Sequence, residues 1–188
     1  MIDNFLRPPR TVGLLVADGV RAIALLSVIV VAVWWTAVDV AVLALALPAT
    51  LAARFLGIRG GIDAALGAAV LLAAWSSVLD LYERIAWWDV LVHFVCTGAL
   101  AMLAYVALDR ARVLREPREA RLWTVLVLTV ALGLALSAVW EIAEWLGHTF
   151  VSQDIYVAYG DTIGDMAAGG AGAAVGGLVL GRVRLLER

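Results

Sequence analysis

Six apolar stretches make up most of this chain, and each is about as long as a helix that crosses a bilayer. They run over residues 20–38, 40–58, 62–80, 89–108, 121–147 and 161–181. A spanning helix needs about 20 predominantly apolar residues. The hydrophobic content of 64% also exceeds the roughly half that is usual in soluble domains. The sequence therefore predicts an all-α, polytopic membrane helix bundle, with one integral membrane domain over residues 1–188 and no separate soluble domain.

The second and third stretches are less regular than the others. Pro48 and Arg54 fall in the second stretch, and Asp63 falls in the third. Either stretch fits a full span, but a tilted or re-entrant segment also fits, because irregular backbone is tolerated in a membrane where protein surrounds it. Both alternatives stay open at this point.

The basic residues predict how the helices are oriented. All 14 are arginine, and every one except Arg84 lies at or near the start of the first stretch, around the junction of the second and third, around the loop between the fourth and fifth, or after the sixth. Arg7, Arg10 and Arg21 stand at the start of the first stretch, which has no small-residue cleavage site and is read as a retained span. The positive-inside rule then places both termini in the cytoplasm.

Seven ionisable residues lie at or just inside the ends of the last three stretches, on the side predicted to be outside. They are Asp89, His93, Glu141, Glu144, His148, Asp161 and Asp165. Spacings of three and four residues put those of each helix on one face. Charged groups are costly in hydrocarbon, so the three faces are expected to turn toward one another and form a site.

So many carboxylates cannot all carry charge at close range, and we expect either protons or a metal ion to accompany them. Carboxylate and imidazole together suit zinc, manganese or iron, whereas carboxylates with water suit magnesium. All seven residues are candidate metal ligands, and Glu141, Glu144 and Asp161 are also candidate catalytic residues. The structural alternative is a network of interhelical hydrogen bonds without a bound ion.

The sixth stretch predicts a closely packed helix. Gly169, Ala173, Gly177 and Gly181 recur at intervals of four, and small residues at this spacing let helix backbones approach one another. We therefore expect Asp161 and Asp165 to be held tightly against neighbouring helices.

Three segments resemble the signature blocks of YjdF-type bacterial inner-membrane proteins and, more distantly, the VanZ-like family. They are Trp88-Asp89-Val-Leu-Val-His93-Phe, Trp140-Glu141-Ile-Ala-Glu144-Trp145 and Tyr159-Gly-Asp161-Thr162-Ile-Gly-Asp165-Met166. The resemblance covers residues from about 85 to 175. It implies a multi-pass protein of the bacterial plasma membrane and singles out Asp89, His93, Glu141, Glu144, Asp161, Thr162 and Asp165, but not His148. It implies no reaction.

Several functions remain open on the sequence alone. The first is a metal-assisted hydrolase or transferase acting on a lipid or envelope precursor; no Gly-x-Ser-x-Gly motif is present, so whether the chain is an enzyme stays undecided. The second is a cation- or proton-binding transporter or sensor, although we find no convincing internal repeat. The third is an accessory subunit of a membrane complex, or a homo-oligomer. The arginine pattern is explained by topology and lipid, not by nucleic acid.

Overall fold

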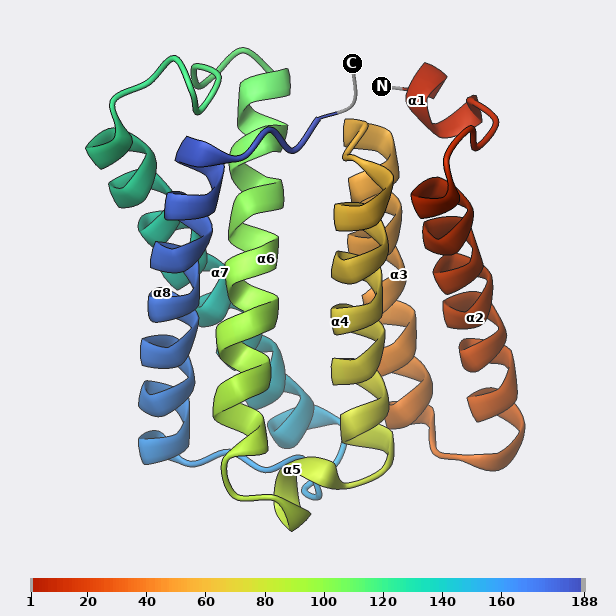
Figure 1. Ribbon diagram of the computed structural model, residues 1–188. Coiled ribbons are helices and arrows are strands. Elements are labelled where there is room, and N and C mark those ends of the chain that lie inside the picture. Colours follow the sequence, from red (N-terminus) through yellow and green to blue (C-terminus); the bar gives the residue numbers. More distant parts are fainter. Residues whose placement is uncertain (1, 187–188) are drawn as a thin grey trace. The chain divides into compact units, whose positions relative to one another are not determined.

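The computed structural model describes residues 2–186 and is all-helical, with six helices long and apolar enough to cross a membrane (Figure 1). These six are α2 (Val12–Trp34), α3 (Ala37–Leu56), α4 (Gly60–Val78), α6 (Trp88–Arg110), α7 (Leu122–Phe150) and α8 (Tyr159–Arg182). Two short helices, α1 (Ile2–Leu6) and α5 (Leu81–Arg84), accompany them. The predicted fold class and the number of spans are confirmed.

The chain divides into two compact units, each built around three of the long helices. Unit 1 contains α1 to α5 together with Leu185 and Leu186, whereas unit 2 runs from Ile85 to Arg184 and contains α6, α7 and α8. Residue Leu185 joins unit 1 through its carbonyl, which accepts a hydrogen bond of 2.7 Å from the Arg59 amide. The prediction of a single membrane domain is compatible with these units but is not tested by them.

The first span begins earlier than the hydropathy pattern predicted. Its N-cap is Thr11, whose side chain accepts a hydrogen bond from the Leu14 amide. Arg21, taken from the sequence as a flanking charge, therefore lies inside α2. It is tolerated there because its guanidinium is paired with Asp18 and Asp63.

The second and third spans are continuous helices. Thr36 and Asp39 form a capping box at the start of α3, and Pro48 is accommodated inside this helix. The helix ends at Gly57, whose positive φ of 73° is a conformation that glycine adopts at little cost. Each helix is of spanning length, 20 residues in α3 and 19 in α4, which favours full spans over re-entrant segments.

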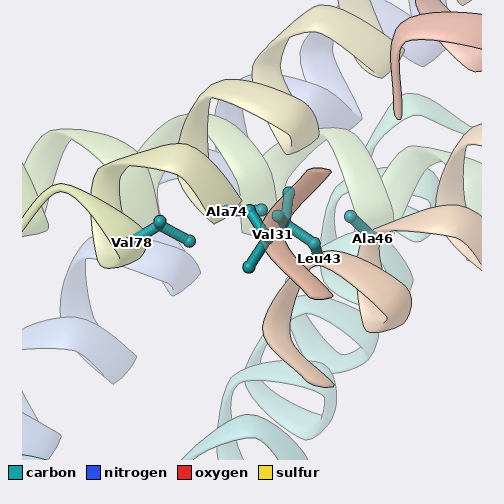
Figure 2. Packing of buried hydrophobic residues seen from close by; sticks show 5 residues of the cluster. All are labelled: Val31, Leu43, Ala46, Ala74 and Val78. Carbon is teal, nitrogen blue, oxygen red and sulfur yellow. The ribbon is translucent and has the colours of Figure 1, made fainter. Parts of the chain in front are cut away.

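Small apolar side chains from three helices form the core of unit 1 (Figure 2). The cluster consists of Val31 on α2, Leu43 and Ala46 on α3, and Ala74 and Val78 on α4. All five are buried. Ala46 and Ala74 are small enough to let the helices pack closely, as expected where lipid provides no hydrophobic driving force between helices.

Glycines bring the helices of unit 2 into contact. The α8 helix packs against both α6 and α7. A Cβ atom added at Gly98 of α6 would lie 2.6 Å from the carbonyl oxygen of Gly172 on α8, and one added at Gly133 of α7 would overlap Ala173. The prediction of a closely packed last helix is confirmed.

Candidate metal centre

The first turns of α6 carry two of the predicted site residues on one helix face. Asp89 and His93 are four residues apart, and Asp89 Oδ1 lies 3.4 Å from His93 Nε2. The Asp89 side chain is 25% exposed and that of His93 is 12% exposed. They belong to the end of unit 2 at which α6 and α8 begin and α7 ends, which we call the acidic end. The helix thus supplies a carboxylate and an imidazole side by side.

Asp165 of α8 faces this pair. Its Oδ2 lies 3.9 Å from His93 Nε2, and its side chain is only 5% exposed. Gly172, two turns deeper in α8, explains the short distance, because a Cβ there would overlap the carbonyl oxygen of Phe94 on α6. This close approach of the two backbones lets a short aspartate side chain reach an imidazole on the neighbouring helix.

Asp89, His93 and Asp165 together form a compact group of ligand atoms. One carboxylate or imidazole atom from each lies within 4.8 Å of the other two. Around a tetrahedral ion with bonds of about 2.1 Å, two ligand atoms lie about 3.4 Å apart. Small side-chain movements would therefore bring all three onto one divalent cation.

The α7 helix adds Glu141 beside this group. Its Oε1 is buried and has no hydrogen-bond partner within the described part of the chain. The Glu141 carboxylate interacts electrostatically with those of Asp165 and Glu144. A buried carboxylate oxygen without a partner is costly, so a ligand at this position would stabilise the folded protein.

Glu144 and Asp161 lie at the edge of the same group. Glu144 interacts electrostatically with Glu141, Asp89 and Asp165. Asp161, in the first turn of α8, acts on the carboxylates of the same two aspartates. Five carboxylates and one imidazole from three helices therefore gather at the acidic end.

His148 has a different set of neighbours. Its Nδ1 donates a hydrogen bond of 2.6 Å to the carbonyl oxygen of Ile155, and its own carbonyl accepts one of 2.8 Å from the Gln153 side chain. Both contacts hold the turn between α7 and α8 against the end of α7. His148 is not one of the three residues whose ligand atoms lie together.

Sequence reasoning did not single out Ser137. This residue is buried, and its Oγ has no hydrogen-bond partner among the residues that the structure describes. A Cβ added at Gly169 of α8 would lie 2.8 Å from that oxygen and 3.0 Å from Thr97 of α6. The sequence spacing could have pointed to this residue. Ser137 lies one turn before Glu141 on α7, so the two side chains share one face of the helix.

Comparison with known proteins identifies the family of the chain. Residues 13–185 match a family described as predicted membrane protein (DUF2238). No match was found among curated proteins or among solved structures. The match covers all six long helices almost completely, together with every residue of the acidic end. The chain is therefore a multi-pass membrane protein in contact with the lipid bilayer, and it belongs to the DUF2238 family of predicted membrane proteins.

Proposed function

We propose that unit 2 binds a divalent metal ion at its acidic end through Asp89, His93 and Asp165. The observation that supports this most directly is the separation of the ligand atoms, which all lie within 4.8 Å of one another. One nitrogen and two oxygen donors suit zinc, manganese or iron, and the surrounding carboxylates also allow magnesium. Metal sites in helix bundles are built in this way, from carboxylates and imidazoles on facing helices.

Glu141 is the proposed fourth ligand. Its buried Oε1 has no hydrogen-bond partner in the described chain, and its charge acts on Asp165. A cation at this position would relieve the repulsion between the two carboxylates and would replace the missing partner. Asp161 and Glu144 would then lie outside the ligand set, where they orient ligands or exchange protons.

The chemistry we propose is metal-assisted hydrolysis or group transfer on a lipid or an envelope precursor. A bound divalent cation would supply Lewis acidity at a phosphoryl or carbonyl oxygen. Glu144, which is not one of the three clustered ligands, is the proposed general base that takes a proton from the attacking water or hydroxyl. His93 and Asp165 lie about 10 Å or less along their helices from the first residue, a depth that lipid head groups reach.

The packing of unit 2 favours this one-sided site over a transport pathway. Below the acidic end, Gly172 touches the Phe94 backbone and Gly98 touches Gly172. Backbone contact at these levels closes the space between α6 and α8 to an ion. A cation- or proton-binding sensor remains the alternative, and it shares the metal site but not the reaction.

We also propose that the protein resides in the bacterial inner membrane with the acidic end outside. The resemblance of three segments to YjdF-type proteins, and distantly to VanZ-like proteins, supports the membrane. The arginines of the loop between α6 and α7, at the other end of unit 2, support the orientation.

Elemental analysis of protein purified in detergent tests the metal site. We expect the wild type to retain a divalent metal after gel filtration, and His93→Ala and Asp165→Asn to lose most of it. Asp154→Asn is the matched control, because Asp154 accepts a hydrogen bond from Ser152 in the outer turn and belongs to no ligand group. A wild type that contains no stoichiometric metal and takes up none of zinc, manganese, iron or magnesium would overturn the proposal.

The reaction is tested separately, with metal-loaded protein and phospholipid vesicles. Release of inorganic phosphate or of a head group is followed, with Glu144→Gln as the variant expected to keep metal and lose turnover. Retained metal without any turnover of phospholipid or isoprenoid phosphate would favour the sensor alternative.

A further inference from the structure

Unit 1 contains an ion cluster, partly buried, that the sequence pattern did not predict. Arg21 of α2 donates a hydrogen bond of 2.7 Å to Asp18, one turn earlier on the same helix, and another to Asp63 of α4. The Asp63 side chain is 1% exposed and that of Arg21 is 12% exposed. Arg21 Nε also donates to the carbonyl oxygen of Thr50 on α3, over 3.0 Å. One guanidinium thus joins all three long helices of the unit.

A second arginine completes the charges of this cluster. Arg54 of α3 is buried, and its Nη2 lies 3.7 Å from Asp18 Oδ2. The same nitrogen donates a hydrogen bond of 2.5 Å to the carbonyl oxygen of Arg7. Two arginines therefore balance the buried Asp63 and the partly exposed Asp18 of unit 1, and a buried charge needs such a partner.

The pattern of ion pairs in unit 1 matches that of unit 2, when each unit is considered by itself. In unit 1, the basic residue is Arg21 on the first long helix. It pairs with Asp18, one turn earlier on the same helix, and with the buried Asp63 near the start of the third long helix. In unit 2, His93 has the same two kinds of neighbour, in Asp89 and Asp165.

The helix packing around the two clusters also corresponds. In unit 1, glycines bring the first and third long helices together, because a Cβ at Gly60 of α4 would overlap Leu14 of α2. In unit 2, Gly172 of α8 lies against Phe94 of α6. Both units therefore have glycine contacts between the first and third long helices, although Gly60 precedes Asp63 by three residues and Gly172 follows Asp165 by seven.

The second long helix marks the difference between the clusters. In unit 1 its C-terminal half supplies Arg54, whereas in unit 2 the C-terminal half of α7 supplies Glu141 and Glu144. Unit 1 thus balances the carboxylates of its cluster with its own guanidinium groups. Unit 2 places two further carboxylates where unit 1 places a cation.

We infer that the chain consists of two corresponding three-helix units, and that the cluster of Asp18, Arg21, Arg54 and Asp63 is an arginine-filled counterpart of a divalent-cation site. Arg21 stands where unit 2 has the proposed ligand His93, and the guanidinium groups of Arg21 and Arg54 supply the positive charge that a bound cation would supply in unit 2. A second observation supports a ligand position here: Asp63 Oδ2 is buried and has no hydrogen-bond partner within residues 2–186. The statement that the cation is a divalent metal ion rests on the function proposed for unit 2. The correspondence between the two units does not rest on that proposal.

Conversion of the unit 1 cluster into a metal site tests this inference directly. We would introduce Arg21→His and Arg54→Glu together into a His93→Ala background. The background removes the unit 2 site, so that any bound metal reports on unit 1 alone. The expected result is one zinc ion per chain and a higher Tm when zinc is added, and both gains should disappear when Asp63→Asn is added.

The design separates this inference from the proposed function of unit 2. Zinc binding by the converted chain supports the correspondence even if the wild type binds no metal at all. A folded, converted chain that binds no zinc, or that binds zinc equally well with Asp63→Asn, would overturn the inference.

A double-mutant cycle provides the measurement if the converted chain does not fold. Arg21→Gln alone should lower Tm by about 10 °C, because it leaves the buried Asp63 carboxylate without its cation. Adding Asp63→Asn should restore part of that loss, since the uncompensated charge is then removed. Strictly additive losses would show that Arg21 is not the counter-cation of Asp63 and would overturn the inference.

Discussion

His93 Nε2 on α6 lies 3.9 Å from Asp165 Oδ2 on α8, and this contact joins two residues that are 72 positions apart in the sequence. Neither residue is in the loop segments at the helix ends; both are inside helices that can span a membrane. An imidazole and a carboxylate so placed are expensive to keep in hydrocarbon unless each satisfies the other or a shared ion.

Metal binding should stabilise the folded protein. At a free metal concentration 100-fold above Kd, a ligand that binds only the folded state adds about 2.7 kcal/mol, which corresponds to roughly 5–10 °C in Tm for a chain of this size. Thermal unfolding in detergent, with and without zinc or manganese, measures the shift. Glu141→Gln should reduce it, whereas Asp154→Asn should keep it. An equal shift in His93→Ala would show that the metal binds elsewhere.

Two glycines of α8 should respond in opposite ways to alanine. A Cβ at Gly172 would overlap the Phe94 carbonyl oxygen, and nothing lies within 4 Å of a Cβ at Gly164. Gly172→Ala should therefore cost about 1–3 kcal/mol, as overpacking does, and should also weaken metal binding. Gly164→Ala should be neutral or stabilise the helix by up to about 1 kcal/mol. Equal stabilities for the two variants would contradict the close approach of α6 and α8.

His148 should affect the outer turn and not the metal. Its Nδ1 donates to the Ile155 carbonyl, so His148→Ala removes a contact that holds residues 151–158. We expect faster cleavage of this turn by an added protease and an unchanged metal content. Loss of metal in His148→Ala, at the level seen in His93→Ala, would place His148 among the ligands.

The two ends of unit 2 should be labelled from opposite sides of the membrane. In a Cys96→Ser background, an impermeant thiol reagent added to intact cells should label Gln153→Cys in the turn after α7. It should not label Glu119→Cys in the arginine-rich loop before α7, and both positions are exposed. Labelling of Glu119→Cys alone would reverse the orientation and place the acidic end in the cytoplasm.

Ser137 should tolerate the loss of its hydroxyl. Because its buried Oγ has no hydrogen-bond partner among the described residues, Ser137→Ala removes an unsatisfied polar group and should leave Tm unchanged or raise it. Thr129→Val is the comparison, since it removes a hydroxyl that donates a hydrogen bond of 2.7 Å to the Val125 carbonyl oxygen. A clear loss of stability in Ser137→Ala would indicate a bound water or ligand that the hydroxyl helps to hold.

The sequence by itself determined the six long helices, their order and the polar face of each of the last three. Hydrophobicity over about 20 residues fixes a membrane span without reference to its neighbours. Likewise, a spacing of four residues places Asp89 next to His93 in any helix. The spacing of the glycines in α8 is also a property of one helix alone. It therefore predicted close packing of α8 without knowledge of the neighbouring helices.

Only the tertiary structure decided which side chains meet. The pairing of His93 with Asp165, the position of His148 against Ile155 and the burial of Arg21 between Asp18 and Asp63 depend on the rotation and depth of each helix against its neighbours. Those quantities are set by how side chains of different helices interdigitate. In a bilayer this packing, and not a general preference for burial, selects among the arrangements that one set of helices allows.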